Sequence, residues 1–367
     1  MERPIPDKEL RNYEKVPLKE NINEYFSREV IPYTPNAWID REKDKIGYEI
    51  NLNNYFYQYE SPRGLHTVTK EIIEKENEIQ QYFNGNPIIR STQSYIDLES
   101  VLFGVDGKYN PSNWEKIKAK WVFREVANKG YPDEPLLAVT QHAGVVPRDS
   151  LEYQVMNPGG NLDSYKLVTP GDFIISLRTF QGGIELSQIR GIVSPAYTIL
   201  KPVRDICGNY FKYYFKSHYF ISLLQSKMTG IRDGKSVPCE DFGQIELSLP
   251  HISVQNAIAK FLDQELAIID SLIAVRRYIQ EWSPPEYRYQ AISGLIQQDK
   301  LPQVTDLLGW LTEDSNKVRV YDSDSFNING VEKSTVLIKE QVQKLQEFRT
   351  ALISEAVTGK IDVRLLG

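Results

Sequence analysis

Side chains that can bind nucleic acid recur in the turn-rich centre of the chain, between residues 114 and 250. The cations are Arg148, Arg178, Arg190, Arg232 and Lys235, and the neutral side chains are Gln141, His142 and Gln181. Arginine binds phosphates, or guanine O6 and N7 through two hydrogen bonds, and glutamine can read adenine N6 and N7. An arginine in a turn is also well explained as a solvated surface charge. The set as a whole therefore favours contact with double-stranded DNA, whereas each residue alone is weak support.

The distribution of charge points to the same segment. The chain of 367 residues has a formal net charge of −6. Residues 114–250 hold 16 basic and 14 acidic side chains, whereas residues 1–85, 86–113 and 251–367 are each net negative. Because DNA binding depends on local positive charge facing phosphates, the negative total does not exclude it.

The sequence lacks the motifs of the obvious enzyme classes. None of its three Asn-Pro pairs continues into Pro-Phe or Pro-Tyr, the motif with which adenine methyltransferases hold a flipped base. The stretch Phe180-Gln181-Gly182-Gly183 lacks the second glycine of a cofactor loop and is interpreted as a turn. The four histidines form no HxxxH or HNH pattern, and two cysteines are too few for a disulfide framework or a cysteine zinc site. We therefore expect no catalytic residue, no metal and no cofactor.

An α+β domain must position the polar loops. Alternating apolar residues predict short strands at 136–140, 172–177, 192–193 and 197–200. Helices are predicted at 210–217 and 219–227.

A strand followed by a long helix closes this domain, between residues 242 and 277. Ile245, Leu247 and Leu249 alternate with polar residues, and the following proline ends the strand. From Val254 onward, apolar residues recur at three- and four-residue steps. This spacing predicts an amphipathic helix of about 24 residues, roughly 36 Å long.

The order of residues in this stretch resembles specificity (S) subunits of type I restriction–modification systems, at the junction between the target-recognition domain and a long helix. The family pattern L-P-x-x-x-x-Q-x-x-I-A-x-F-L-D, followed by I-D-x-L-I, is matched by Leu249-Pro250, Gln255, Ile258-Ala259, Phe261-Leu262-Asp263 and Ile269-Asp270-Ser271-Leu272-Ile273. Stretches within residues 130–149, 170–183, 191–197 and 230–234 also resemble type I target-recognition domains. The resemblance implies that the polar loops of this domain read DNA.

The second helical motif of the family lies much further along the chain than usual. The pattern A-L-I-S-x-A-V-T-G-K-I-D is matched at 351–362, on a helix predicted to start near Val336 and to end at Gly359. About 58 extra residues, 278–335, precede it, and Ser283-Pro284-Pro285 is expected to end the first helix. Inside this insert we expect short helices at 290–298 and 303–311 and a polar loop or hairpin at 314–334. The side chains expected to form partner or dimer helices are Ile258, Leu262, Ile269, Leu272, Val342, Leu345 and Leu352.

Residues 1–85 resemble a different protein of the same systems, the C-terminal tail of the methyltransferase (M) subunit. The pattern V-x-P-x-x-P-D-A-W-I-D, followed by K-x-G-Y-E-I, is matched at 30–40 and 45–50, with Asn36 where the family usually has Asp. The aromatic residues are too dense for a free linker, and a helix is predicted at 69–83. In the family this tail packs near the S-subunit helices, which makes a covalent fusion of tail and specificity segment geometrically sensible.

These observations predict an α+β protein with one target-recognition domain followed by long antiparallel, coiled-coil-type helices. The expected divisions are an M-tail-like segment at 1–85, a connector at 86–113, the DNA-binding domain at 114–250, a long helix at 251–277, the insert at 278–335 and a second helix at 336–367. No apolar run is long enough for a membrane span and no signal peptide is visible, so a cytoplasmic location is expected.

The expected function is that of a non-catalytic specificity subunit that positions a separate adenine methyltransferase, and a restriction motor subunit, on a bipartite DNA site. With one recognition domain, the chain is expected to form a homodimer through its long helices. The alternative is an interaction or decoy protein in which DNA reading has been lost. The truncated M-like tail and the insert favour this alternative mildly, and the intact loops around Arg148, Arg178 and Arg232 argue against it.

Overall fold

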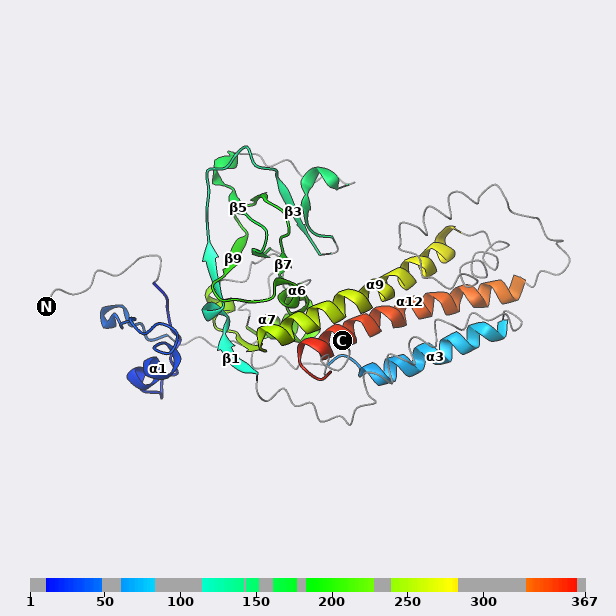
Figure 1. The fold of residues 1–367 in the computed structure, drawn as a ribbon, viewed down its shortest axis with the longest axis horizontal. Coiled ribbons are helices and arrows are strands. Elements are labelled where there is room, and N and C mark those ends of the chain that lie inside the picture. Colours follow the sequence, from blue (N-terminus) through cyan, green and yellow to red (C-terminus); the bar gives the residue numbers. More distant parts are fainter. Residues whose placement is uncertain are drawn as a thin grey trace.

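The computed structural model describes residues 11–47, 61–82, 114–141, 143–151, 161–176, 183–227, 239–282 and 328–361. An α+β body lies at one end, and three long helices extend from it side by side (Figure 1). Among the described helices, none is long and apolar enough to cross a membrane. The α+β class predicted from the sequence is confirmed.

The body contains ten short strands in the described part of the chain. They are β1 (Glu115–Lys118), β2 (Phe123–Val126), β3 (Leu137–Thr140), β4 (Gly144–Pro147), β5 (Lys166–Val168), β6 (Phe173–Ile175), β7 (Glu185–Leu186), β8 (Gly191–Val193), β9 (Thr198–Pro202) and β10 (Glu246–Leu249). All the pairings between these strands are antiparallel, in one four-stranded sheet of order β2-β9-β6-β7 and three two-stranded sheets, β1-β10, β3-β4 and β5-β8.

The helices frame this body. They are α1 (Ile22–Glu29), α3 (Leu65–Tyr82), α6 (Gly208–Lys216), α7 (His218–Lys227), α8 (Cys239–Gly243), α9 (Ile252–Trp282) and α12 (Ile328–Val357). Short 3-10 turns are η1 (Arg41–Lys43), η3 (Ala119–Trp121), η4 (Arg148–Ser150) and η5 (Leu162–Ser164).

Two apolar clusters hold the body together. The larger one joins the four-stranded sheet to α6 through phenylalanine rings, for example Phe123 against Phe211, whose ring centroids lie 5.1 Å apart, and Phe173 against Phe215 at 5.4 Å. Five aromatic residues of α6 are buried, namely Tyr210, Phe211, Tyr213, Tyr214 and Phe215. Packing of these rings holds the helix in the core. The smaller cluster lies among β3, β5, β6, β8 and β9, further from the helices, and is built from short aliphatic side chains.

The strand β10 leads directly into α9, and a buried glutamine fixes the junction. The Gln255 amide donates a hydrogen bond from Nε2 to the carbonyl of Pro250 at 2.8 Å. Its Oε1 accepts a hydrogen bond from the backbone N–H of Cys207 at 2.9 Å, just before α6. Gln255 is 1% exposed, so one side chain satisfies two otherwise orphaned backbone groups inside the core.

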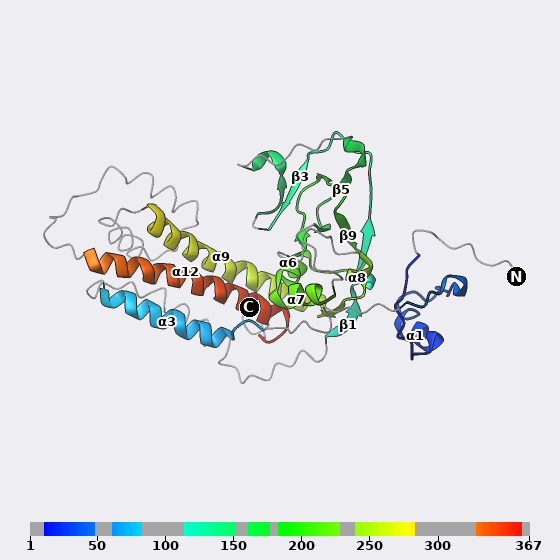
Figure 2. The same cartoon turned by 180° about the vertical axis from the view of Figure 1, so that it is seen from behind.

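The helices α9 and α12 run antiparallel, and α3 lies along the other side of α12 (Figures 1 and 2). Asp270 of α9 accepts a hydrogen bond from Arg349 Nε of α12 at 2.8 Å. Leu65, Val68 and Ile72, one apolar face of α3, are buried in the same core cluster as α12. Three ion pairs flank that face: Lys344–Glu71 at 2.7 Å, Lys75–Glu340 at 3.0 Å and Arg63–Glu347 at 3.2 Å.

The glycine at the end of α12 adopts a left-handed conformation. Gly359 has φ +74°, and the N–H groups of Gly359 and Lys360 bond back to Ala356 and Glu355 at 3.2 and 2.9 Å. This is the Schellman arrangement that glycine favours, and it confirms the helix end predicted from the sequence.

Most predicted elements of the domain correspond to observed ones, and some boundaries need correction. The predicted strands correspond to β3, β6, β8 and β9, and the two predicted helices to α6 and α7. The first long helix is 31 residues rather than about 24, because the sequence contains no helix breaker before Ser283. The last helix begins at Ile328 rather than near Val336, so the end of the predicted 314–334 loop is helical.

The remaining expectations for the insert, residues 283–327, and for the connector, residues 86–113, lie outside the described residues. The helix predicted at 69–83 is α3, which starts four residues earlier at Leu65. Helix α1 was not predicted, although Asn21 caps it by accepting hydrogen bonds from the N–H groups of Asn23 and Glu24.

Candidate nucleic-acid interface

The β3–β4 hairpin places Gln141 at an exposed tip. Three residues link Thr140 to Gly144, its cross-strand partner. Gly144 has φ +70°, the left-handed position of such a loop. The Thr140 hydroxyl accepts a hydrogen bond from the N–H of Ala143 at 3.0 Å and donates one to the carbonyl of Gly144 at 3.1 Å. The tip is therefore a defined turn, and Gln141 is presented to solvent on it.

Arg148 lies at the opposite end of the hairpin. It follows β4 and opens η4, and its backbone N–H donates to the carbonyl of Leu136 at 2.9 Å. Four strand residues separate it from the tip, about 13 Å at the usual rise per residue. The structure thus does not bring Arg148 and Gln141 together. The Arg148 side chain is half-buried.

Arg190 is close to the same end of the hairpin as Arg148. The backbone N–H of Ile192, two residues further on, donates to the carbonyl of Pro135 at 2.8 Å, which ties this segment to the approach of β3. Arg190 Nε donates to the Glu134 carboxylate at 2.7 Å, and its guanidinium lies 6.0 Å from the centroid of the Tyr131 ring. Its charge is therefore already balanced by an acidic partner in this structure, although the side chain is 49% exposed.

The β6–β7 loop that carries Arg178 and Gln181 is anchored at its described end by a glycine and a buried carboxylate. Gly183 has φ +85°, and a Cβ there would lie 2.3 Å from the carbonyl oxygen of Phe215. Two residues later, Glu185 is 5% exposed and pairs with Lys216 Nζ at 2.8 Å. Burial raises the pKa of Glu185, and the Lys216 ammonium opposes this.

Glu185 also connects the two loops. A Cβ on Gly144 would lie 3.6 Å from Glu185 Oε2, so the base of the β3–β4 turn rests against this carboxylate. Neither Glu185 nor Lys216 is among the candidate residues predicted from the sequence. The available signal was an acidic residue between two apolar ones, Ile184 and Leu186, because an acidic side chain in a buried strand usually has a specific partner.

The other candidate loop residues are His142, Arg178, Gln181, Arg232 and Lys235, and these lie outside the described residues. Of the eight candidates, the structure thus places three, Gln141, Arg148 and Arg190. It brings Arg148 and Arg190 to one end of the distal apolar cluster and leaves Gln141 at the other. Among the described residues there is no cluster of three His, Cys, Asp or Glu side chains that could hold a metal ion.

The candidate partner-helix residues are buried inside the chain itself. They are Ile258, Leu262, Ile269, Leu272, Val342, Leu345 and Leu352, each at most 8% exposed. They belong to the core cluster that joins α9, α12, α3 and α6. These side chains therefore hold the helices of one chain together in this structure.

Three polar residues of the long-helix motif also have contacts within the chain. The Asp263 carboxylate accepts a hydrogen bond from the Tyr213 hydroxyl of α6 and pairs with Lys212 at 3.4 Å. Burial, followed by this hydrogen bond, raises the pKa of the Tyr213 hydroxyl well above its ordinary value. Gln255 and Asp263 thus connect α9 to α6, and Asp270 connects it to α12.

The architecture is thus an α+β domain mounted on one end of a helical arm formed by α3, α9 and α12 (Figure 1). No protein-family model matches the chain, and no curated protein matches it. Two examples show the extent of its similarity to solved structures. One is described as the HsdS subunit from Thermoanaerobacter tengcongensis, at 14% identity and a TM-score of 0.30, covering 68% of this chain and 56% of that one.

The second structure is described as showing complex assembly and conformational transition of the type I R-M system. The chain matches it at 14% identity and a TM-score of 0.33, covering 78% of this chain and 57% of that one. The chain thus spans little more than half the length of either structure.

Proposed function

We propose that this chain is a sequence-reading DNA-binding subunit of the type I restriction–modification class, with a single target-recognition domain at 114–250. The observation that carries the proposal is the way the two family-like helix motifs meet. They are separated by about 80 residues in sequence, yet they form one antiparallel pair, α9 and α12, rooted beside the domain. The polar members of these motifs make the contacts that hold the pair and the domain together.

In this proposal the chain performs no catalysis. It positions a separate adenine methyltransferase subunit, and a restriction motor subunit, on DNA. The hairpin tip with Gln141 and the segment with Arg148 and Arg190 are separated along the domain, so they would contact different parts of a duplex. Direct base reading comes from side chains such as these, and other cations of the loops bind phosphates.

A single recognition domain reads one half of a bipartite target, so we propose that two copies pair to read a palindromic bipartite site. The apolar side chains expected to serve as partner helices are buried within the chain. Pairing through the helical arm would therefore use the outer faces of α9, α12 and α3, where Ile268 and Val336 are exposed apolar residues at 41% and 56%.

The proposal is tested by selecting random duplex DNA with the purified protein and determining its mass by light scattering in the same buffer. We expect enrichment of a bipartite sequence and the mass of a dimer. A folded protein that enriches no sequence, alone or with a methyltransferase subunit added, would overturn the DNA-reading assignment.

One observation favours a second candidate, an interaction or decoy protein. Arg190 is paired with Glu134 in this structure, and this pairing reduces the positive charge that it presents to a duplex. Replacement of Glu134 by Gln separates the two functions: a DNA-reading protein gains affinity when Arg190 is released, whereas a decoy shows no DNA binding with either residue at position 134.

A further inference from the structure

Two lysines at the base of the α+β body are largely removed from solvent. The side chains of Lys118 and Lys120, at the end of β1 and in η3, are 19% and 7% exposed. Burying an ammonium group is costly unless a counter-charge and hydrogen-bond acceptors accompany it. The residues that supply the counter-charges and hydrogen-bond acceptors therefore indicate which kind of partner binds this surface.

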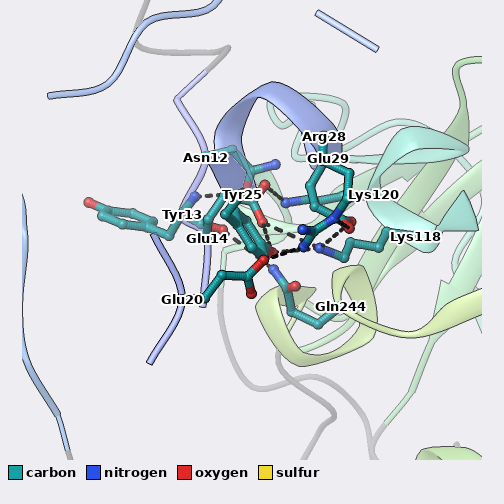
Figure 3. Close-up of polar contacts among 10 residues, drawn as sticks. All are labelled: Asn12, Tyr13, Glu14, Glu20, Tyr25, Arg28, Glu29, Lys118, Lys120 and Gln244. Atoms are coloured by element: carbon teal, nitrogen blue, oxygen red, sulfur yellow. Dashed lines mark hydrogen bonds and ion pairs between the residues drawn. The ribbon is translucent and has the colours of Figure 1, made fainter. Parts of the chain in front are cut away.

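All the acidic partners of these lysines come from residues 11–47 (Figure 3). Lys118 Nζ pairs with Glu29 at 3.0 Å and donates a hydrogen bond to the Tyr25 hydroxyl at 2.6 Å. That hydroxyl donates in turn to the Glu14 carboxylate at 2.9 Å, and Glu14 also pairs with Lys120. The Tyr25 ring lies under the Lys118 ammonium, 4.8 Å from its centroid, and Tyr25 is 5% exposed.

The protonation states are consistent with this contact. Burial lowers the pKa of Lys118, but hydrogen bonds to Tyr25 and Glu29 outweigh it and raise the pKa above its ordinary value. Hydrogen bonds from Arg28 and then Lys118 lower the pKa of Glu29. Burial lowers the pKa of Lys120 to about 8, so the ammonium beside the Glu14 carboxylate is still mostly protonated at pH 7. The two lysines of the surface are thus matched in charge by the carboxylates of Glu14 and Glu29.

A stacked pair of rings extends the same contact. Tyr33 lies against Trp121, with ring centroids 5.1 Å apart and planes 18° from parallel. The Arg204 guanidinium lies 5.9 Å from the Tyr33 centroid. At the far edge, Lys15 pairs with Asp241 at 3.1 Å, and Gln244 donates to the carbonyl of Tyr13 at 3.4 Å. The contact is therefore broad, with a desolvated centre and a polar rim, as in an interface between separate proteins.

We propose that the surface formed by Lys118, Lys120 and Trp121 is a docking site for an M-subunit-like tail that presents carboxylates and aromatic rings to it. Residues 11–47 occupy this site within the same chain and so compete with the corresponding tail of a separate methyltransferase subunit. The part of the segment that matches the M-tail pattern, from Val30 onward, includes the Tyr33 ring on Trp121. The surface and its occupant follow from this structure, and only the identity of the competing partner rests on the proposed function.

Tethering gives the intramolecular segment a large advantage. A segment joined to its site through a short linker experiences an effective concentration on the order of millimolar. A free copy of the same segment with a Kd of about 10 μM would then bind the intact protein roughly 100-fold more weakly than an emptied site. Competition of this size is measurable.

The test uses the full-length protein and a labelled synthetic peptide of residues 11–47, with binding followed by fluorescence anisotropy. Glu14→Lys/Glu29→Lys in the protein disrupts the tethered copy and leaves the surface intact, so peptide affinity should rise by about 100-fold over wild type. Lys118→Glu/Lys120→Glu disrupts the surface and should bind no wild-type peptide. That variant should bind a peptide carrying Glu14→Lys/Glu29→Lys, because the charges are then matched again.

Urea unfolding of each variant is the control for folding, and Trp121→Ala, which leaves the charges unchanged, is a second surface variant expected to weaken peptide binding about tenfold. Equal peptide affinity of wild type and the Glu14→Lys/Glu29→Lys variant, or no binding by either, would overturn the proposal. A wild-type protein of dimer mass that the peptide converts to monomers would instead identify a second copy as the occupant, and would overturn the partner assignment.

Selection of DNA by the same variants keeps the two proposals separate. Peptide exchange without DNA enrichment would leave the docking site established and remove the DNA-reading function. DNA enrichment without peptide exchange would support the DNA-reading function and overturn the docking site.

Discussion

At the scale of single residues, the polar positions of the long-helix motif act as connectors between elements. Gln255 joins the end of β10 to the start of α6, Asp263 joins α9 to α6, and Asp270 joins α9 to α12. A buried group that satisfies two backbone partners is costly to remove, because both partners lose their hydrogen bonds away from water.

Replacement of Gln255 by Ala is therefore expected to lower the free energy of unfolding by about 2–4 kcal/mol, roughly 1–2 kcal/mol for each orphaned partner. The measurement is urea unfolding followed by tryptophan fluorescence. Gln264→Ala, at an exposed position of the same helix, is the matched control and should change stability by less than about 0.5 kcal/mol. Equal effects of the two changes would show that the Gln255 hydrogen bonds do not contribute.

Substitution of two glycines with positive φ can distinguish the cost of backbone strain from the cost of steric overlap. Gly171 and Gly183 have φ +94° and +85°, but an added Cβ meets nothing within 4 Å at Gly171 and the Phe215 carbonyl at Gly183. Gly171→Ala should cost about 1–2 kcal/mol from backbone strain alone, and Gly183→Ala should cost clearly more. Gly183→Ala should also weaken DNA binding, since it displaces the base of the β6–β7 loop. Similar stability losses for both variants would mean that the packing of Gly183 on α6 is easily relaxed.

Arg178 is the candidate contact whose removal tests DNA binding most directly. Arg178→Ala should lower DNA affinity and, for a phosphate contact, reduce the slope of log K against log salt by about 0.9. The control is Arg41→Ala, which removes the same charge from η1, away from the recognition loops. Unchanged affinity and slope for Arg178→Ala would exclude it as a contact.

At the scale of elements, α3 is attached to α12 by a narrow apolar face and by ion pairs along its edges. Glu71 is central, because both Arg63 and Lys344 contact its carboxylate. A hydrogen bond from Arg63, followed by one from Lys344, lowers the pKa of Glu71 to about 2. Because this pKa is lower in the folded state, the stabilisation is complete above the ordinary value near 4.5 and is lost as pH falls toward 2.

Glu71→Gln should therefore destabilise the protein slightly at pH 7, and the difference from wild type should shrink as pH is lowered from 4.5 toward 2.5. Urea midpoints of both proteins across this range provide the measurement. The effect is small because the pair is substantially exposed to solvent. Glu74→Gln, at an exposed position of α3, is the control. A difference that stays constant with pH would mean that the Glu71 charge does not stabilise the contact.

The elements that the sequence predicts well are those with local signals. Pro284 and Gly359 mark the ends of α9 and α12 within two residues, because each residue limits the backbone by itself. The pairing of β1 with β10 joins residues such as Glu115 and Leu249 that are far apart in sequence, and no local pattern identifies such a partner.

In the candidate site, too, local features could be predicted from the sequence, whereas contacts between distant residues could not. Residue type alone suggests that arginine in a loop can bind DNA, but the Glu134 partner of Arg190 is 56 residues away, and only the fold shows it. The buried contacts of Lys118 and Lys120 were missed for the same reason, because alternating lysines in a short strand look like a solvated face.

At the scale of the whole molecule, the two segments of the N-terminal region contact different parts of the protein. Residues 11–47 contact the base of the α+β body, and α3 contacts the helical arm. A segment that resembles a partner's tail is therefore attached at two places, and detaching one leaves the other in position.

The antiparallel arrangement of α9 and α12 has a geometric consequence. The last residue of α9, Trp282, and the first of α12, Ile328, both lie at the end of the arm away from the body (Figure 1). A helix of 31 residues spans roughly 46 Å. A fluorophore or surface anchor attached between these two residues would therefore lie at the end of the helices that is far from the body. From there it would report the orientation of the recognition domain without contacting that domain.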